Sequence, residues 1–141
     1  MLQFKLLTPT AMVPQKATAG SAGYDLAPSE DCASDAAGRL IVGTGVAAAI
    51  PPGYYGRIAL RSGFASRTPC LVTGGVIDSD YRGELLVLLT CSSAVRIERG
   101  QRFAQLIVER IYDGPSEVVD ELVKAERRHD GFGSTGERLF K

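Results

Sequence analysis

A chain of 141 residues with 45% hydrophobic side chains has the length and apolar content of one domain with its own core. Its 16 basic and 16 acidic side chains cancel, whereas a polynucleotide-binding surface usually carries a basic excess. We therefore expect no polynucleotide partner and only local phosphate binding. No apolar run approaches the ~18 residues of a membrane helix, and no cleavable signal follows Met1, so no membrane partner is expected either.

The three cysteines are Cys32, Cys70 and Cys91, an odd number at wide spacing. This count does not suit a closed disulfide framework, and no C-x-x-C pair indicates a zinc site. The cysteines therefore favour a reducing compartment, and we expect an intracellular location in the cytoplasm or nucleus.

Short apolar runs that end at glycine or proline follow one another along the chain. They predict extended segments at residues 4–7, 40–42, 46–50, 54–60, 95–98 and 103–108, the last one extending as far as 112. Short strands separated by glycine and proline turns are typical of an all-β sandwich or barrel.

Only two segments have a helical pattern. One is a single turn after Arg61-Ser62-Gly63, and the other is 115–127, where Val118, Val119, Leu122 and Val123 recur at roughly helical spacing. β-branched residues also suit a strand, so the second segment stays ambiguous. After Ala125 the apolar pattern stops and the chain becomes charged and then glycine-rich. We expect a domain at 1–125 and a mobile C-terminal arm at 126–141.

The segment 74–84 lies between the apolar runs 71–72 and 85–89 and contains glycines, aspartates and a serine. It predicts a β-hairpin with a wide tip, whose glycines let backbone groups approach a flat ligand closely. On an extended strand Asp78 and Asp80 would point the same way and Tyr81 the opposite way, unless the tip is irregular. The segment suits base recognition beside a hydrolytic centre, or else it is a solvated hairpin with surface acids.

Three further features have a functional and a structural interpretation. The segment 61–63 offers a guanidinium, a hydroxyl and a glycine at a helical start, which forms an anion site or a capped turn. The segment 131–136 is a phosphate-wrapping loop without the P-loop lysine, or a flexible terminus. Gln105 lies inside an apolar strand pattern, where its amide contacts either a ligand or the protein.

The order of the motifs A-G-Y-D-L, R-S-G, G-V-I-D-S-D-Y-R-G-E, G-Q-R-F-A-Q-L-I and G-F-G-S-T-G resembles the five motifs of the trimeric deoxyuridine triphosphatases (dUTPases). The resemblance runs from about Leu6 to Phe140. It implies a β jelly roll that forms homotrimers with three active sites at subunit interfaces. It also implies hydrolysis of dUTP to dUMP and pyrophosphate with Mg²⁺. This reaction limits uracil incorporation into DNA and supplies dUMP for thymidylate synthesis.

The resemblance also assigns roles by matched position. Asp78 corresponds to the general base that activates the attacking water, and Tyr81 to the tyrosine under the deoxyribose. The remaining assignments are the uracil-reading backbone at Gly75, Val76 and Leu86; phosphate contacts at Arg61, Ser62, Gly63 and Gln105; Asp25 near the metal, acting through water; and, in the arm, Arg127 for the γ-phosphate, Phe132 for stacking on uracil, and Gly133, Ser134 and Thr135 for the phosphates.

The chain departs modestly from the family pattern. Leu60 precedes R-S-G where a proline or small residue is common, Phe64 replaces a usual leucine and Phe103 a usual isoleucine. Two other readings remain: a dCTP deaminase on the same fold, whose extra length and glutamate–arginine pattern are missing from this chain, and a non-catalytic nucleotide-sensing module. The intact Asp78 argues against the second reading.

Overall fold

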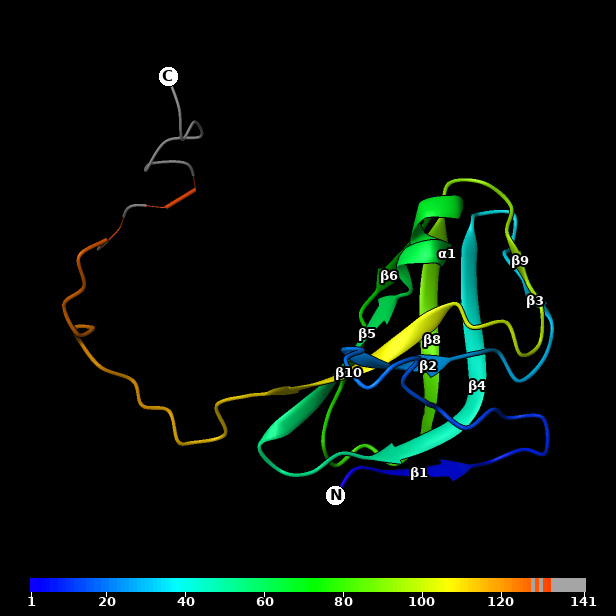
Figure 1. Cartoon of the computed structure of the whole chain (residues 1–141). Helices are drawn as coiled ribbons and strands as arrows, with labels where there is room; N and C mark the ends of the chain where they lie inside the picture. The colour runs from blue at the N-terminus through cyan, green and yellow to red at the C-terminus, as the bar shows by residue number, and fades with distance from the viewer. Residues whose placement is uncertain (128, 130, 133–141) are drawn as a thin grey trace.

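A computed structural model describes residues 1–127, 129, 131 and 132 of the chain. Two four-stranded antiparallel sheets face each other across one core (Figure 1). Sheet A has the order β1 (Gln3–Leu6), β4 (Arg39–Ala49), β8 (Glu84–Cys91), β6 (Cys70–Thr73). Sheet B has the order β2 (Gly23–Leu26), β10 (Ala104–Arg110), β5 (Tyr54–Leu60), β7 (Val76–Ile77). A ribbon of β3 (Cys32–Ala33) and β9 (Arg96–Ile97) and one short helix, α1 (Ser62–Arg67), complete the described elements.

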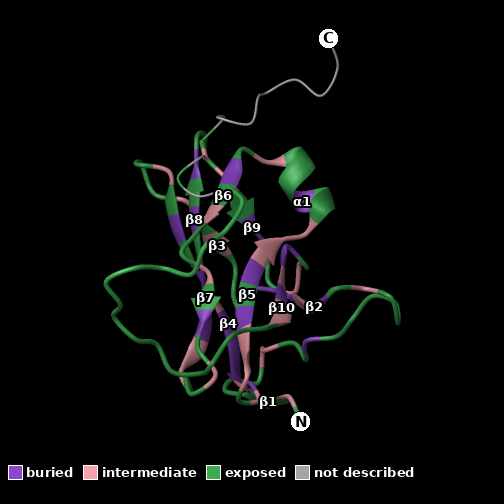
Figure 2. Cartoon of the chain, turned by 90° about the vertical axis from the view of Figure 1, so that its left-hand side faces the viewer, coloured by how far each residue is buried: buried purple, intermediate pink, exposed green. Residues whose placement is uncertain are grey.

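The core follows from period-2 alternation along the strands. In β8, Leu85, Val87 and Leu89 are buried, whereas Leu86 and Leu88 face outward. Figure 2 shows the ribbon coloured by burial. Leu106 of β10 supplies part of the opposite wall. The all-β class is confirmed, and the facing antiparallel sheets agree with the jelly-roll-like architecture expected from the sequence.

The helix α1 is held by aromatic packing. Phe64 is buried, and its ring meets that of Phe103 edge-on at a centroid distance of 5.7 Å. Arg61 is the residue before the first helical turn, and its carbonyl accepts the Ala65 amide at 2.9 Å. The helical turn predicted after 61–63 is therefore confirmed. The packing fixes the position of Arg61 at the end of β5.

Strand β4 differs from the sequence prediction, because 40–42 and 46–50 belong to one strand from Arg39 to Ala49 rather than two. The register against β8 shifts between Gly43 and Ala47, which marks a β-bulge. Gly45 has φ +66° there, and a Cβ on it would lie 2.7 Å from the Thr8 hydroxyl. The glycines that read as a break between strands instead form a bend within one.

The predicted hairpin is present and has an unexpected third strand. Its arms are β6 and β8, which pair from Cys70 opposite Cys91 to Thr73 opposite Leu88. Between the two arms the chain leaves sheet A, and β7 pairs with β5 of sheet B. The tip thus connects the two sheets at one edge of the molecule.

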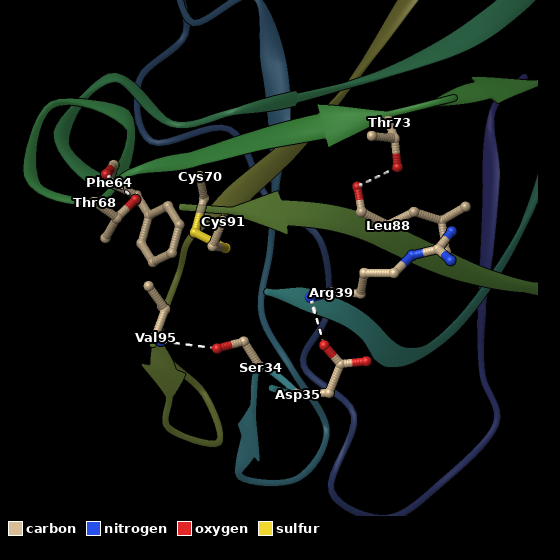
Figure 3. Close-up of a disulfide and its surroundings, with 10 residues drawn as sticks. All are labelled: Ser34, Asp35, Arg39, Phe64, Thr68, Cys70, Thr73, Leu88, Cys91 and Val95. Atoms are coloured by element: carbon tan, nitrogen blue, oxygen red, sulfur yellow. Dashed lines mark hydrogen bonds between the residues drawn. A yellow bond between two sulfur atoms is a disulfide. The ribbon is translucent and has the colours of Figure 1, made fainter. Parts of the chain in front are cut away.

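Cys70 and Cys91 form a disulfide between the two arms of this hairpin (Figure 3). The expectation that the cysteines do not suit a disulfide is wrong for this pair. The two residues face each other across adjacent strands although they are 21 positions apart. Cys32 is free, and burial, followed by the nearby Asp31 carboxylate, raises the pKa of its thiol. The cysteines therefore no longer indicate a reducing compartment.

After Arg110 the chain leaves the body as a long segment that leads into the C-terminal arm (Figure 1). No helix or strand forms in the described residues after this point, so the helical interpretation of 115–127 is wrong. Val118, Leu122 and Val123 are almost fully exposed, since this segment has no surface of its own body to pack against. Among the described residues, no helix is long and apolar enough to cross a membrane.

Candidate active site

The hairpin tip forms an open pocket of about 240 Å³ at the edge where the two sheets meet. Five residues predicted from the sequence lie in it together. The full lining is Gly75, Val76, Ile77, Asp78, Tyr81, Glu84, Leu86 and Leu88. The pocket therefore brings together an acid, an aromatic ring and exposed backbone, the three components proposed for base recognition and hydrolysis.

Asp78 begins a turn rather than continuing a strand. The Tyr81 amide donates to the Asp78 carbonyl at 3.1 Å, and the Arg82 guanidinium donates to the Ser79 carbonyl at 2.7 Å. The extended geometry considered for Asp78 and Asp80 is therefore absent, and the irregular alternative holds. Because of the turn, Asp78 and Tyr81 line the same pocket, and Asp80 is not part of its lining.

Tyr81 is held by its hydroxyl group. This group donates to the Glu84 carbonyl at 2.9 Å, while 41% of the residue remains exposed. A Cβ at Gly83 would overlap the Tyr81 ring and hydroxyl, so only glycine lets the ring lie against the backbone there. The ring consequently forms a wall of the pocket and keeps one face accessible.

Gly75 brings bare backbone to the pocket. It has φ +90°, a conformation that L side chains rarely adopt, and its carbonyl accepts the Ile58 amide at 2.8 Å. A Cβ on Gly75 would lie only 3.1 Å from the Ile58 carbonyl oxygen. The close contact with β5 thus fixes the backbone that is proposed to read the uracil edge.

A second cluster surrounds Asp25 on β2. The Asp25 side chain is only 8% exposed, and its Oδ1 lies 3.1 Å from Nε of Arg61. Its Oδ2 lies 3.5 Å from Nη1 of Arg102, but among the described residues this atom has no hydrogen-bond partner. We treat the Arg102 contact as a long ion pair, since its length exceeds the usual hydrogen-bond range. Asp25 therefore keeps one buried oxygen available.

Gln105 belongs to this cluster because it pairs with Asp25 across β10 and β2. Its amide nitrogen donates to the Leu60 carbonyl at 3.2 Å, and a Cβ at Gly23 would collide with its amide oxygen. Ser62 and Gly63 follow Arg61 as exposed residues at the start of α1. The predicted phosphate contacts of the body thus lie around the end of β5 and the neighbouring strands.

A further charged cluster lies on β5 and β10. Glu109 accepts hydrogen bonds from Arg57 at 2.8 Å and from the Tyr55 hydroxyl at 2.7 Å. The Arg57 hydrogen bond, followed by that of Tyr55, lowers the pKa of the Glu109 carboxyl, although both partners of the ion pair remain well exposed. No sequence motif pointed to this cluster.

The predicted residues of the arm are only partly described. Arg127 and Phe132 are exposed, and Phe132 has φ +50°. Gly133, Ser134 and Thr135 lie outside the described residues. Of the two described residues, neither Arg127 nor Phe132 lines the hairpin pocket.

Sequence reasoning missed two residues of these clusters. Arg102 faces Asp25, and its place in G-Q-R-F-A-Q-L-I, three residues before Gln105, was the available signal. Glu84 ends the hairpin motif and lines the pocket, and its position at the start of an apolar strand suggested only a boundary. Both are charged residues beside motif residues that were assigned roles.

The described residues contain no group of three or more histidine, cysteine, aspartate or glutamate side chains that could enclose a metal. The donor chemistry nevertheless fits magnesium, because Mg²⁺ prefers oxygen ligands and often meets a protein through one or two carboxylates while it holds substrate phosphates. Asp25 Oδ2, which forms a long ion pair with Arg102 but accepts no hydrogen bond among the described residues, is such a donor. Asp25 therefore fits a magnesium ion that is held mostly by a bound phosphate ligand and that meets the carboxylate directly or through water.

A double-sheet β protein with an acid–tyrosine pocket and a separate arginine–carboxylate cluster has the features of a nucleotide-binding class. Residues 10–136 match the sequence model of the family described as dUTPase. The chain belongs to the dUTPase family.

Relatives agree over nearly the whole chain. The deoxyuridine 5'-triphosphate nucleotidohydrolase of Paramecium bursaria Chlorella virus 1 is 46% identical and covers 96% of this chain and 97% of the relative. The enzyme of that name from Saccharomyces cerevisiae is 42% identical, covering 96% and 95%.

Solved structures agree as well. A mutant of Staphylococcus bacteriophage 80alpha dUTPase with dUpNHpp superposes with a TM-score of 0.88 at 30% identity, covering 96% of this chain and 98% of that one. A mutant of the dUTPase from phage phi11 of S. aureus, whose structure reveals the coordination of a structural Mg(II) ion, gives a TM-score of 0.81 at 26% identity, covering 86% and 97%.

Proposed function

We propose that this chain is a dUTP diphosphatase that converts dUTP to dUMP and pyrophosphate, with Asp78 as the general base. The observation that carries the proposal is the pocket in which Asp78, Tyr81 and the Gly75 backbone meet. This reaction removes dUTP before uracil enters DNA and supplies dUMP for thymidylate synthesis. The membership of the chain in the dUTPase family supports the substrate.

Asp78 is proposed to take a proton from the water that attacks the α-phosphorus. Its turn places the carboxylate on the pocket lining and leaves the residue exposed, so water can reach it. A carboxylate base within hydrogen-bond reach of water contributes about 10²–10⁴-fold. Pyrophosphate leaves as the bond from the α-phosphorus to the bridging oxygen breaks.

Tyr81 is proposed to select the sugar. Its ring forms a wall of the pocket, so a deoxyribose packs against the ring face while a 2′-hydroxyl finds no room. The backbone at Gly75 and Val76 and the side of Leu86 are proposed to read the uracil edge. The fixed φ of Gly75 supports this role, because recognition by bare backbone requires an approach that a side chain would block.

The second cluster is proposed to hold the phosphate chain and magnesium. Arg61, Ser62, Gly63 and Gln105 would contact phosphate oxygens, and the free Asp25 oxygen would face the metal through water. Bound magnesium would neutralise phosphate charge and keep the leaving group in line. Arg61 already contacts Asp25, which fixes the guanidinium at the same position.

The distance between the two clusters supports shared sites. Val76 lies on β7 and Asp25 on β2, three strand spacings or about 14 Å across sheet B. The α-phosphorus must lie within a few ångströms of Asp78, since a base acts through a water at hydrogen-bond distance. The dUTPase resemblance implies a homotrimer with sites between subunits, and we propose that each hairpin pocket works with the Asp25 cluster of another copy.

The arm is proposed to complete the site. The segment that leads into it runs away from the body after Arg110, and its Val118, Leu122 and Val123 side chains are almost fully exposed. We propose that the arm from 126 onward closes over bound nucleotide, with Arg127 on the γ-phosphate and Phe132 on the base. Ser134 and Thr135, assisted by the Gly133 backbone, would then donate to the phosphates.

The intracellular location also remains a prediction.

The deciding experiment measures pyrophosphate release with Mg²⁺ from dUTP, dTTP, dCTP and UTP. We expect rapid release from dUTP alone. Asp78→Asn should reduce turnover at least ~10²-fold while dUTP still binds. Asp80→Asn is the matched control, because this second acid of the turn does not line the pocket.

Three outcomes would contradict the proposal. Ammonia release from dCTP would identify a deaminase. Binding of dUTP without pyrophosphate release would identify a nucleotide-sensing module. Near-normal turnover of Asp78→Asn would remove Asp78 from the role of base.

A further inference from the structure

Glu84 connects the pocket to the bulge in β4. Its side-chain Oε1 accepts the Gly45 amide at 2.7 Å, and its backbone carbonyl accepts the Tyr81 hydroxyl at 2.9 Å. The residue also lines the pocket itself. One residue therefore joins sheet A to the aromatic wall of the pocket.

The Gly45 amide has a fixed direction. Gly45 lies in the bulge with φ +66°, and its α-carbon is surrounded by Thr8 and Ala11. A backbone amide that a bulge removes from the ladder needs another acceptor, and an ionised carboxylate forms a shorter and stronger bond than a neutral group. Glu84 supplies that acceptor, so the start of β8 is fixed relative to β4.

The Tyr81 ring is anchored through its hydroxyl group. It is 41% exposed, and Gly83 below it offers only backbone. Its hydroxyl bond to the Glu84 carbonyl therefore sets where the ring lies. If the Glu84 side chain releases Gly45, this carbonyl can shift at the first residue of the strand, and the ring shifts with it.

We propose that Glu84 is a positioning residue that sets the Tyr81 ring and thereby the preference for a deoxyribonucleotide over a ribonucleotide. The inference rests on the proposed function, because the preference is read from the hydrolysis of dUTP and UTP. Glu84 acts through Tyr81 and does not itself contact the reacting atoms.

The test compares kcat/KM for dUTP with kcat/KM for UTP in four variants. Glu84→Ala should lower the ratio about five- to tenfold, the effect of one ordinary hydrogen bond, because the displaced ring excludes the 2′-hydroxyl less well. Glu84→Gln keeps an acceptor oxygen and should stay within about twofold of the wild type. Tyr81→Phe should lower the ratio as Glu84→Ala does, and the double variant should lower it no further.

Thr44→Val is the matched control for general damage to the bulge. The buried Thr44 hydroxyl donates to the Leu85 carbonyl at 2.8 Å, next to Glu84 and on the same strand pair. Its loss should reduce stability and leave the ratio unchanged. An unchanged dUTP/UTP ratio in Glu84→Ala, or an equal change of the ratio in Thr44→Val, would overturn the proposal. So would a Glu84→Gln variant whose ratio falls as far as that of Glu84→Ala, or a double variant in which the effects of Glu84→Ala and Tyr81→Phe add.

A second readout is independent of turnover. In NMR, Glu84→Ala should lose hydrogen-exchange protection of the Gly45 amide and shift the Tyr81 ring signals, whereas Glu84→Gln should keep both. A wild-type protein that releases no pyrophosphate would refute the proposed function alone, and the NMR signals would still decide the role of Glu84. Unchanged Tyr81 ring signals in Glu84→Ala would refute that role.

Discussion

Replacing Gly75 with alanine tests whether the pocket depends on the close approach of the hairpin tip to β5. Gly74 and Gly75 both have positive φ, +67° and +90°. Among the residues that the structure describes, a Cβ on Gly74 meets nothing within 4 Å, whereas a Cβ on Gly75 lies 3.1 Å from the Ile58 carbonyl oxygen and 3.2 Å from the Val72 side chain. Gly74→Ala therefore reproduces the conformational strain without the contact and is the matched control.

The expected magnitudes follow from these contacts. An L residue in the left-handed region costs roughly 1–2 kcal/mol, so Gly74→Ala should lower the free energy of unfolding by about this amount. Gly75→Ala adds crowding against backbone that cannot rotate away and weakens the bond from the Ile58 amide to the Gly75 carbonyl, each about 1 kcal/mol. Its total cost should be about 3–4 kcal/mol.

The functional effect should differ more sharply than the stability. Because a displacement of about 1 Å can cost 10²-fold in rate, we expect Gly75→Ala to lower kcat/KM for dUTP about 10- to 100-fold. Gly74→Ala should stay within about threefold of the wild type, since no pocket atom has to move. Urea unfolding and pyrophosphate release measure the two quantities. Equal losses in the two variants would show that strain alone, and not the approach to β5, matters.

Three further predictions concern the proposed site. Tyr81→Ala should narrow the preference for dUTP over UTP, measured as the ratio of kcat/KM values, and an unchanged ratio would place the discrimination elsewhere. Light scattering should give about three times the chain mass of 15.0 kDa, and a fully active monomer would contradict shared sites. Deleting the residues after Ala125 should reduce kcat and leave the body and trimer intact. Ordering the glycine-rich arm costs roughly 1–2 kcal/mol per residue, so we expect the arm to close only when a bound triphosphate offsets this cost. Amide exchange of the arm should accordingly slow with a non-hydrolysable dUTP analogue and Mg²⁺ but hardly with dUMP, and full activity without the arm would exclude a lid.

Local sequence patterns predicted the parts of this fold that depend on neighbouring residues. The run 54–60 and the helical turn after 61–63 appear as β5 and α1, because strand alternation and a helical start are encoded over a few positions. The tip at 74–84 was located for the same reason. Its five predicted pocket residues do meet, since a turn brings sequence neighbours together.

Non-local pairings were beyond the reach of these patterns. The two residues of β7 pair with β5 rather than with their own hairpin, and nothing within 74–84 specifies that partner. The same reason explains the missed contacts of Glu84 with Gly45 and of Arg102 with Asp25. The segment 115–127 shows the opposite error, because apolar spacing suggested a helix where the chain has no adjacent surface to stabilise one.

The Cys70–Cys91 disulfide makes the hairpin a covalent ring. A ring of this size restricts the unfolded chain by roughly 3–4 kcal/mol in the loop-closure account, and all of Gly74 to Glu84 lies inside it. The entropy of closing a loop grows only slowly with its length, by about 0.6 kcal/mol for each doubling. Residues can therefore be inserted at the tip at little entropic cost while the bases of both arms stay joined, and the length of the pocket-forming segment can vary separately from the alignment of the strands that carry it.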